Sequence, residues 1–168
     1  MNNNDILRRL RYIFDLNDTE MLKVFALADI TVSPKKLHQW LRREEDPEYA
    51  EMKDYSLAVF LNGLIAKFRG KREGEAPRAE RKLTHNLILR KLKIALSLQS
   101  EEMLAIWQRV DFRLSKHELS SFFRQPGHRN YRVCQDQVLR NFLQGLQLKL
   151  RPESERTESE STESEQED

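Results

Sequence analysis

The chain has 168 residues, of which 39% are hydrophobic and 33% are charged, and its formal net charge is +2. This length corresponds to one or two domains, and the composition is typical of a soluble, largely helical protein with a modest core. No apolar run approaches the length that crosses a bilayer, and Met1–Asp5 lacks the basic and apolar regions of a secretion signal. We therefore expect a cytoplasmic protein that is not associated with a membrane.

The sequence repeats itself at an offset of 82 residues, which aligns Asn86 with Asn4. The pattern Asn-x-Ile-Leu-Arg-x-Leu occurs at 4–10 and at 86–92, and Phe-Leu-x-Gly-Leu occurs at 60–64 and at 142–146. About a third of the aligned pairs are identical, which indicates a tandem duplication. Because each copy is small for a domain, we expect the two halves to support each other.

In each copy the first three helices are predicted from apolar spacing and capping residues. Ile6, Leu7 and Leu10 recur at helical spacing, and Met21, Leu22 and Phe25 begin a second apolar stripe after a break at Asn17-Asp18. A third helix is predicted to start at Ser33-Pro34, with serine as the N-cap and proline at the first helical position. In the second copy the corresponding helix start has the sequence Ser115-x-x-Glu118, which is the pattern of a capping box.

The fourth helix of each copy carries the strongest apolar stripe, and we expect it to be central. Asp54 and Asp136 are predicted to cap it, and Gly63 and Gly145 lie in its middle. A glycine inside a helix costs about 1 kcal/mol relative to alanine, so another segment is expected to approach closely there. In the first copy the stripe is formed by Leu57, Phe60, Leu61, Leu64 and Phe68.

The predicted fold is all-α, with two tandem four-helix repeats packed with pseudo-twofold symmetry. The expected units are a first repeat at 1–69, a flexible polar linker at 70–82, a second repeat at 83–151 and a tail at 152–168. The tail holds eight acidic residues and one arginine, so residues 1–151 carry +9 and the tail −7. Without aliphatic or aromatic residues the tail is predicted to be disordered. Two roles are expected for it: a solubilising segment, or an internal polyanion that competes for the basic body.

No pattern points to catalysis, a metal or a cofactor. The four histidines, His38, His85, His117 and His128, have no partners at ligand spacing, and none recurs at the same repeat position. There is no phosphate-binding glycine loop and no nucleophile elbow. The single cysteine, Cys134, aligns with Met52 and is expected to fill the same half-buried space. We therefore expect a protein that is not an enzyme.

Both copies share a short set of polar residues, which allows two readings. In the first reading Arg42 pairs with a carboxylate such as Asp54 while Tyr49 packs beneath it. In the second, Arg42 and Arg124 are twin anchors for an anionic group. The shared structural residues are Tyr49, Asp54, Tyr131 and Asp136, together with the pairs Asn4 and Asn86, and Asp29 and Asp111.

Basic residues gather on the predicted outer faces of the first and third helices. Such faces are candidates for binding an anion or a partner, or for following nucleic-acid phosphates, although a charged face is often simply solvated. The segment 32–42 resembles the second helix of a helix-turn-helix, but the preceding turn lacks the usual glycine and is one residue longer than the turn of that motif. The candidate binding residues are Arg8, Arg9, Arg11, Lys35, Lys36, Arg42, Arg43, Arg90, Lys91, Lys93 and Arg124.

The paired segments NDILRRLRYI and NLILRKLKIA, with the stretch FRLSKHELSSFFRQPGHRNYRVCQDQVLRNFLQGL, resemble the YehS-like family of bacterial proteins. The resemblance covers nearly everything from Asn4 to Arg151 and excludes the tail. It implies a bacterial cytoplasmic origin and a duplicated helical domain, and it transfers no activity or catalytic residue.

These observations lead to one functional prediction and one alternative. We expect a non-enzymatic binding or adaptor module, because duplicating a unit doubles its binding face and increases avidity without any new contact. The expected partner is a protein that contacts exposed apolar and basic surface between the repeats. The alternative is a regulatory protein that binds RNA or DNA through its basic helix faces. Partner identity and oligomeric state stay open.

Overall fold

The computed structural model describes residues 1–152, and these form helices and loops without a strand. The first half contains α1 (Asn3–Ile13), α2 (Asp18–Leu27), α3 (Pro34–Leu41) and α4 (Asp54–Arg69). The second half contains α5 (His85–Ala95), α6 (Ser100–Gln108), α7 (Lys116–Phe122) and α8 (Asp136–Leu150). The all-helical prediction is confirmed over this range, whereas the predicted disordered tail lies outside it, apart from Pro152.

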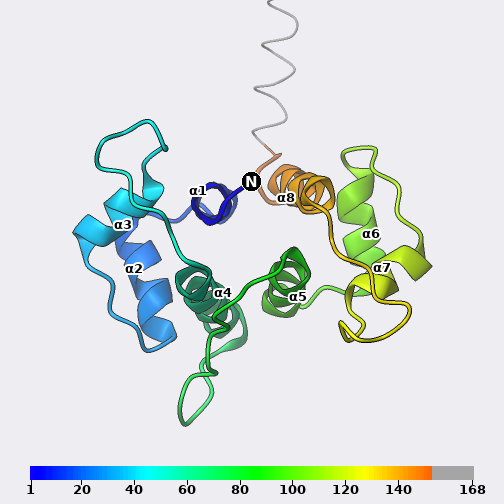
Figure 1. Ribbon diagram of the computed structural model, residues 1–168, viewed down its shortest axis with the longest axis horizontal. Coiled ribbons are helices and arrows are strands. Elements are labelled where there is room, and N and C mark those ends of the chain that lie inside the picture. The colour runs from blue at the N-terminus through cyan, green and yellow to red at the C-terminus, as the bar shows by residue number, and fades with distance from the viewer. Residues whose placement is uncertain (153–168) are drawn as a thin grey trace, which may run out of the picture.

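Four helices form the centre of the molecule, and two pairs flank them (Figure 1). Helices α1 and α8 lie next to each other, and α4 lies next to α5, so each repeat contributes two central helices. Helices α2 and α3 cover one side, and α6 and α7 cover the other. The buried apolar side chains of both halves belong to a single core cluster, as expected from the small size of each copy.

The mid-helix glycines mark close helix crossings in both copies, as predicted. A Cβ atom on Gly63 would lie 2.0 Å from the carbonyl oxygen of Val24 on α2. A Cβ atom on Gly145 would lie 2.1 Å from the carbonyl oxygen of Ile106 on α6. Both distances are far below van der Waals contact, so only glycine lets the backbones approach this closely. The fourth helix of each repeat is thereby locked against its second helix.

Buried aromatic rings reinforce each of these crossings. Phe25 of α2 packs on Phe60 of α4 with ring centroids 5.2 Å apart, and Trp107 of α6 packs on Phe142 of α8 at 4.9 Å. The indole Nε1 of Trp107 also donates a hydrogen bond of 3.0 Å to the carbonyl of Val138, so its polar atom is satisfied. The stripe of the first copy ends earlier than predicted, because the side chain of Phe68 is 41% exposed.

Most helix starts agree with the sequence prediction, but the fourth helices do not. Asn17 caps α2, and Ser33 caps α3 with Pro34 in the first turn. Ser115 and Glu118 form the predicted capping box of α7. The predicted caps Asp54 and Asp136 are wrong, because these residues occupy the first helical position and follow Lys53 and Gln135.

Asp54 and Asp136 instead accept hydrogen bonds from the other repeat. The backbone N–H of Leu83, ahead of α5, donates to Asp54 over 2.8 Å. The amino group of Met1, ahead of α1, lies 3.1 Å from Asp136. At the offset of 82 residues Leu83 aligns with Met1 and Asp136 with Asp54, so the two contacts are equivalent.

Two further contact pairs between the repeats are equivalent in the same way. Arg9 of α1 donates to Gln144 of α8 over 2.9 Å, and its counterpart Lys91 of α5 donates to Asn62 of α4 over 2.6 Å. At the other end Arg151 donates to the carbonyl of Tyr12 over 2.8 Å, and Arg69 lies 3.5 Å from the carbonyl of Ile94. The start, middle and end of α1 therefore meet the start, middle and end of α8, which makes the two helices parallel.

The connection from α4 to α5 runs back along these two helices and is bonded to the body of the protein at several points. Lys71 pairs with Asp29 at the end of α2, and the carbonyl of Pro77 lies 3.5 Å from the amide of Asn62. Farther along, Glu80 lies 2.9 Å from Lys91 of α5. Ala79 and Leu83 pack against the core. The segment predicted as a flexible linker thus covers the crevice between α4 and α5.

Candidate anion-binding site between the repeats

A pocket of about 390 Å³ lies at the junction of the repeats, where α1 meets α8. Four arginine side chains line it from three parts of the chain. Arg8 and Arg9 come from α1, Arg140 comes from α8, and Arg43 comes from the loop after α3. The remaining lining residues are Met1, Asp5, Tyr12 and Gln147.

Arg9 is the most confined of these arginines. One terminal nitrogen donates to Gln144, but the buried Nε has no hydrogen-bond partner among the described residues. Burial lowers the pKa of Arg9, and the positive charge of Arg140 lowers it further. A half-buried guanidinium beside a second guanidinium is a costly arrangement unless an anion balances the charge. Position 9 therefore favours a negatively charged ligand.

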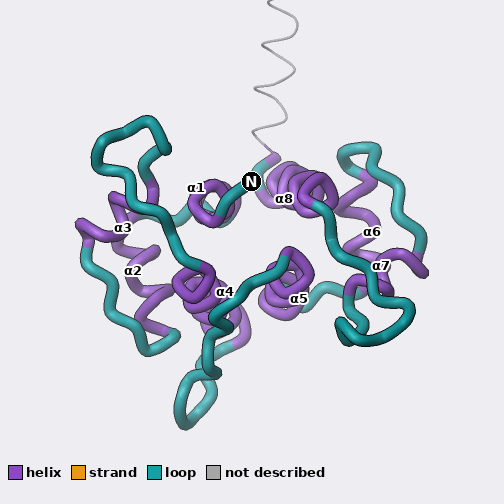
Figure 2. Tube along the Cα trace, viewed as in Figure 1, coloured by secondary structure: helices purple, strands orange, loops and turns teal. Residues whose placement is uncertain are grey.

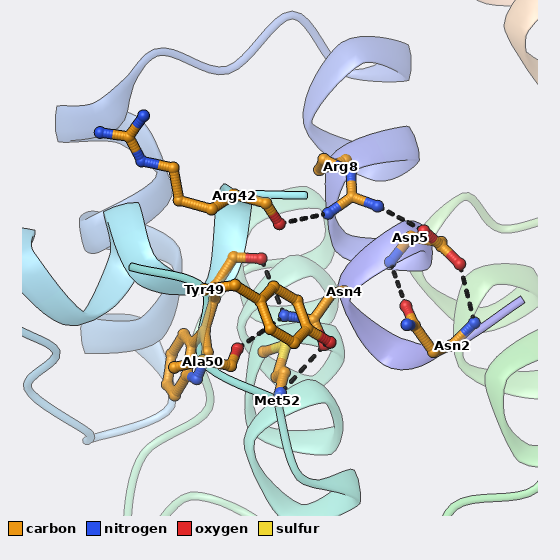
Figure 3. A network of polar contacts seen from close by, with 9 residues as sticks. Asn2, Asn4, Asp5, Arg8, Arg42, Tyr49, Ala50 and Met52 are labelled. Atoms are coloured by element: carbon orange, nitrogen blue, oxygen red, sulfur yellow. Dashed lines mark hydrogen bonds and ion pairs between the residues drawn. The ribbon is translucent and has the colours of Figure 1, made fainter. Parts of the chain in front are cut away.

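The other arginines differ in how far their charge is already balanced. Arg8 pairs with Asp5 and donates to the carbonyl of Arg42 over 2.8 Å (Figure 3). Arg140 lies 3.0 Å from Asp136 on the same helix. Arg43 is exposed and makes no side-chain ion pair with any residue in 1–152. The pocket therefore has more positive charge than its own carboxylates neutralise.

A second depression of about 490 Å³ continues the pocket along α1, because Arg8 and Tyr12 line both. Arg151 also lines this depression and stacks on the Tyr12 ring, with the guanidinium carbon 4.5 Å from the ring centroid. Tyr12 is 44% exposed, so it offers an aromatic surface to a ligand. The two depressions form a basic groove, defined here by Arg8, Arg9, Arg43, Arg140 and Arg151 around Tyr12.

The buried side chain of Asn4 positions the loop that carries Arg43 (Figure 3). Its amide donates to the carbonyls of Trp40 and Ala50, both at 2.9 Å. Its oxygen accepts from the backbone N–H of Met52 and from the Tyr49 hydroxyl, both at 3.0 Å. One side chain thus ties the start of α1 to both ends of the loop between α3 and α4.

Asn86 repeats this arrangement in the second half. Its amide donates to the carbonyls of Phe122 and Arg132, and its oxygen accepts from the N–H of Cys134 over 2.8 Å. The shared asparagine is therefore a structural residue. Tyr49 takes part in the network, whereas no equivalent bond joins the Tyr131 hydroxyl to Asn86 within the described residues.

Arg42 pairs with carboxylates, as the first reading expected, but the suggested partner Asp54 is wrong. Arg42 lies 3.4 Å from Asp46 and 3.6 Å from Glu48, both within the loop that follows it. Asp54 instead accepts from Asn3 and Leu83. The aligned residue Arg124 is exposed and has no ion pair in the described part of the chain. Arg42 and Arg124 lie outside the lining of the pocket at the junction.

The sequence had indicated that the remaining basic residues lie on outer faces, but several of them bond to other parts of the protein. Lys35 and Lys36 are exposed on the first turn of α3. Arg11 pairs with Asp18, and Lys93 lies over the Phe123 ring. Arg90 donates to the carbonyl of Phe123, and Lys91 is held between Asn62 and Glu80. Of the predicted binding residues only Arg8, Arg9 and Arg43 meet in the pocket.

Sequence reasoning missed three residues of the basic groove: Tyr12, Arg140 and Arg151. Two of them left a signal in the sequence. Arg140 aligns with Ala58. An arginine where the other copy has a buried alanine indicates that the two sites differ in their surroundings. Arg151 aligns with Arg69, so that pair could have been found among the shared residues.

Residues 1–152 show no group of three or more His, Cys, Asp or Glu side chains able to hold a metal ion. In the same range no helix is both long enough and apolar enough to cross a membrane. Cys134 is a free, buried thiol in the space that Met52 fills in the first repeat, and it is more deeply buried than expected.

The fold and the groove define a class: an all-helical protein with a duplicated domain and a basic pocket where the copies meet. The chain belongs to the DUF1456 family, described as a protein of unknown function, whose model matches residues 3–70 and again 85–151. It is 41% identical over 147 residues to the uncharacterized protein YehS of Escherichia coli K12, covering 87% of this chain and 94% of that protein. No solved structure matches the chain significantly. The resemblance inferred from the sequence is thereby confirmed.

Proposed function

We propose that this protein is a non-enzymatic binding or adaptor module that holds an acidic segment of a partner protein in the basic groove. The observation that carries the proposal is the convergence of Arg8, Arg9, Arg43 and Arg140 around one pocket. Arginine is well suited to this task, because its planar fork binds carboxylates in a bidentate manner. We propose that the protein acts in the cytoplasm, whose reducing environment keeps a thiol such as Cys134 free.

Three features of the groove favour a protein segment as the ligand. Tyr12 adds an exposed aromatic surface, and aromatic residues with arginine are the groups that dominate protein interfaces. Carboxylates also line the rim, since Asp5, Glu44 and Glu45 border an adjoining cavity that Arg8 shares. A continuous phosphate backbone would meet those carboxylates, whereas a peptide can place its acidic side chains selectively.

We also propose that the repeats, 1–69 and 83–151, pack about a pseudo-twofold axis. The equivalent contacts of Asp54 and Asp136 with the other repeat support this arrangement. So do the equivalent contacts made by Arg9 and Lys91. In such a protein the connection 70–82 covers one of two related crevices, which leaves the α1–α8 crevice as the binding face.

Binding of a glutamate-rich fluorescent peptide, measured by anisotropy at low salt, tests the proposed function. Changing Arg9→Gln together with Arg140→Gln should weaken binding by roughly tenfold or more, because charge-assisted hydrogen bonds are lost. The matched control changes Lys35→Gln with Lys36→Gln, which removes the same charge from α3 and should leave affinity nearly unchanged. Circular dichroism verifies folding, and Arg43→Gln alters the pocket at an exposed position.

An unchanged affinity in both Arg9→Gln/Arg140→Gln and Arg43→Gln, or no binding of the peptide to the wild type, would contradict the proposal. The second candidate is nucleic-acid binding, which is favoured by the exposed Lys35 and Lys36 on the capped start of α3. In that case mixed RNA or DNA should bind with a steep salt dependence, and the Lys35/Lys36 variant should lose affinity instead.

A further inference from the structure

The two related crevices between the repeats differ in one respect: one is covered and the other is open. The connection 70–84 runs from the end of α4 back to the start of α5. It lies over the line where these helices meet, because Pro77 contacts Asn62 of α4 and Glu80 contacts Lys91 of α5. Asn62 is 8% exposed and Val59 is 3% exposed beneath it. On the α1–α8 side the aligned residues Gln144 and Asn141 are only partly buried. No described segment covers them.

At the offset of 82 residues the covering segment aligns with the tail. Residues 70–82 correspond to 152–164, and Arg69, which precedes the connection, corresponds to Arg151. The two arginines are anchored alike. Arg69 bonds to Ser97 over 2.7 Å, and Arg151 lies 3.5 Å from Asp15, the residue aligned with Ser97. The tail therefore starts where the connection starts, relative to its own pair of helices.

The covered crevice shows which chemistry fits the open one. Lys91 is 11% exposed there and lies 2.9 Å from Glu80 of the connection. The residue aligned with Lys91 is Arg9, whose buried Nε has no partner in the described range. Position 162 aligns with Glu80 and is flanked closely by Glu160 and Glu163. A carboxylate supplied from this part of the tail would give Arg9 the partner that Glu80 gives Lys91.

Length and charge permit this placement. The 15 residues of α8 span about 22 Å at a rise of 1.5 Å per residue. An extended chain covers roughly 3.3 Å per residue, so seven residues suffice to run back along the helix. The tail carries eight acidic residues and one arginine, which complements the arginines of the groove.

We propose that the acidic segment 153–168 docks in the basic groove of its own chain, with a glutamate on Arg9, and competes there with the partner. The docking rests on the alignment of the two crevices, whereas the competition rests on the function proposed above. Because the tail is tethered, its effective concentration at the groove is in the millimolar range. Even a weak contact between the tail and the groove therefore reduces the binding of an acidic ligand of similar intrinsic affinity.

The test uses the full chain in two forms. In the neutral-tail variant the seven glutamates of 153–168 are changed to glutamine and Asp168→Asn removes the last charge. The first measurement is the NMR resonance of the Arg9 Nε–H group without any added ligand. It should differ between wild type and neutral-tail variant, and this difference should diminish at high salt. An Arg9→Gln variant identifies the resonance.

The second measurement is the affinity for the glutamate-rich peptide. The neutral-tail variant should bind it roughly tenfold more tightly than the wild type, as expected for removal of a tethered competitor. With Arg9→Gln and Arg140→Gln in both backgrounds, that difference should disappear. The Lys35→Gln/Lys36→Gln pair, which lies on α3, should preserve it.

The outcomes separate the two proposals. An unchanged Arg9 resonance together with equal peptide affinity overturns the docking of the tail, while peptide binding itself would leave the proposed function standing. A changed resonance with no peptide binding by either form supports the docking and rejects the proposed function. A changed resonance with equal peptide affinities overturns the competition.

Discussion

Replacing Gly145 with alanine should destabilise the protein, although alanine is the better helix former. The new Cβ would lie 2.1 Å from the carbonyl oxygen of Ile106 and 3.0 Å from its Cγ2. The oxygen belongs to helical backbone and cannot rotate away, so α6 and α8 must move apart by about 1 Å to restore contact. Overpacking of this kind costs up to about 3 kcal/mol, and alanine returns about 1 kcal/mol of helix propensity. The net loss is about 2 kcal/mol.

Urea and thermal unfolding followed by circular dichroism measure this loss. For a protein of this size about 2 kcal/mol lowers the melting temperature by roughly 4–8 °C. Gly63→Ala should behave in the same way, because its Cβ would lie 2.0 Å from the carbonyl oxygen of Val24. Gly127→Ala is the matched control, since no atom lies within 4 Å of the added Cβ. A Gly145→Ala protein as stable as the wild type would refute the close-crossing argument.

Three further changes test other features. Asn4→Ala should lower the free energy of unfolding by about 3 kcal/mol or more in urea titrations, because buried groups at Trp40, Ala50 and Met52 lose their partner. The variant Asn2→Ala, which removes an exposed helix cap, should lower it by only about 1 kcal/mol. Equal losses of stability in the two variants would contradict the structural role of the Asn4 hydrogen bonds. Burial raises the pKa of Cys134 to about 12, so the native state holds the thiol proton more tightly than the unfolded chain. The resulting contribution to stability is complete below about pH 8.5, the pKa of an unfolded cysteine, and is lost as the pH rises towards the pKa of the native thiol. Unfolding in urea should therefore show a steeper loss of stability above about pH 8.5 in the wild type than in Cys134→Ala, and parallel curves would argue against it. Asp111→Gly should stabilise the protein by about 0.5–1 kcal/mol in thermal unfolding, since Asp111 has a left-handed φ of 55° after α6, and no gain would count against strain at that position.

The sequence was most informative where the same signal occurs in both copies. The mid-helix glycines, the serine caps and the apolar stripes all reflect local backbone geometry or burial, and these properties are encoded in a few neighbouring residues. Asp54 shows the limit of such reasoning. An acidic residue at the start of a helix fits either the cap or the first turn, and the group that Asp54 accepts from, the N–H of Leu83, belongs to the other repeat.

The candidate site was only partly predictable for a similar reason. Arg8 and Arg9 are neighbours on one helix, and the helical pattern alone does not reveal which of them faces α8. Only the packing of the two repeats places Arg9 beside Gln144 and Arg140. Arg42 was misassigned because the loop after α3 supplies its own carboxylates, Asp46 and Glu48, at short range.

The parallel pairing of α1 with α8 has a consequence for how the chain is made. A ribosome synthesises α1 early and α8 late, so the inner face of α1 emerges long before its neighbour exists. Helices α2 to α4 can pack against α1 in the meantime, but the side that bears Arg9 stays exposed to solvent until Gln144 of α8 has been synthesised. Among the described helices α8 is the last to be made, and a nascent chain halted before α8 would leave that side of α1 open to chaperones.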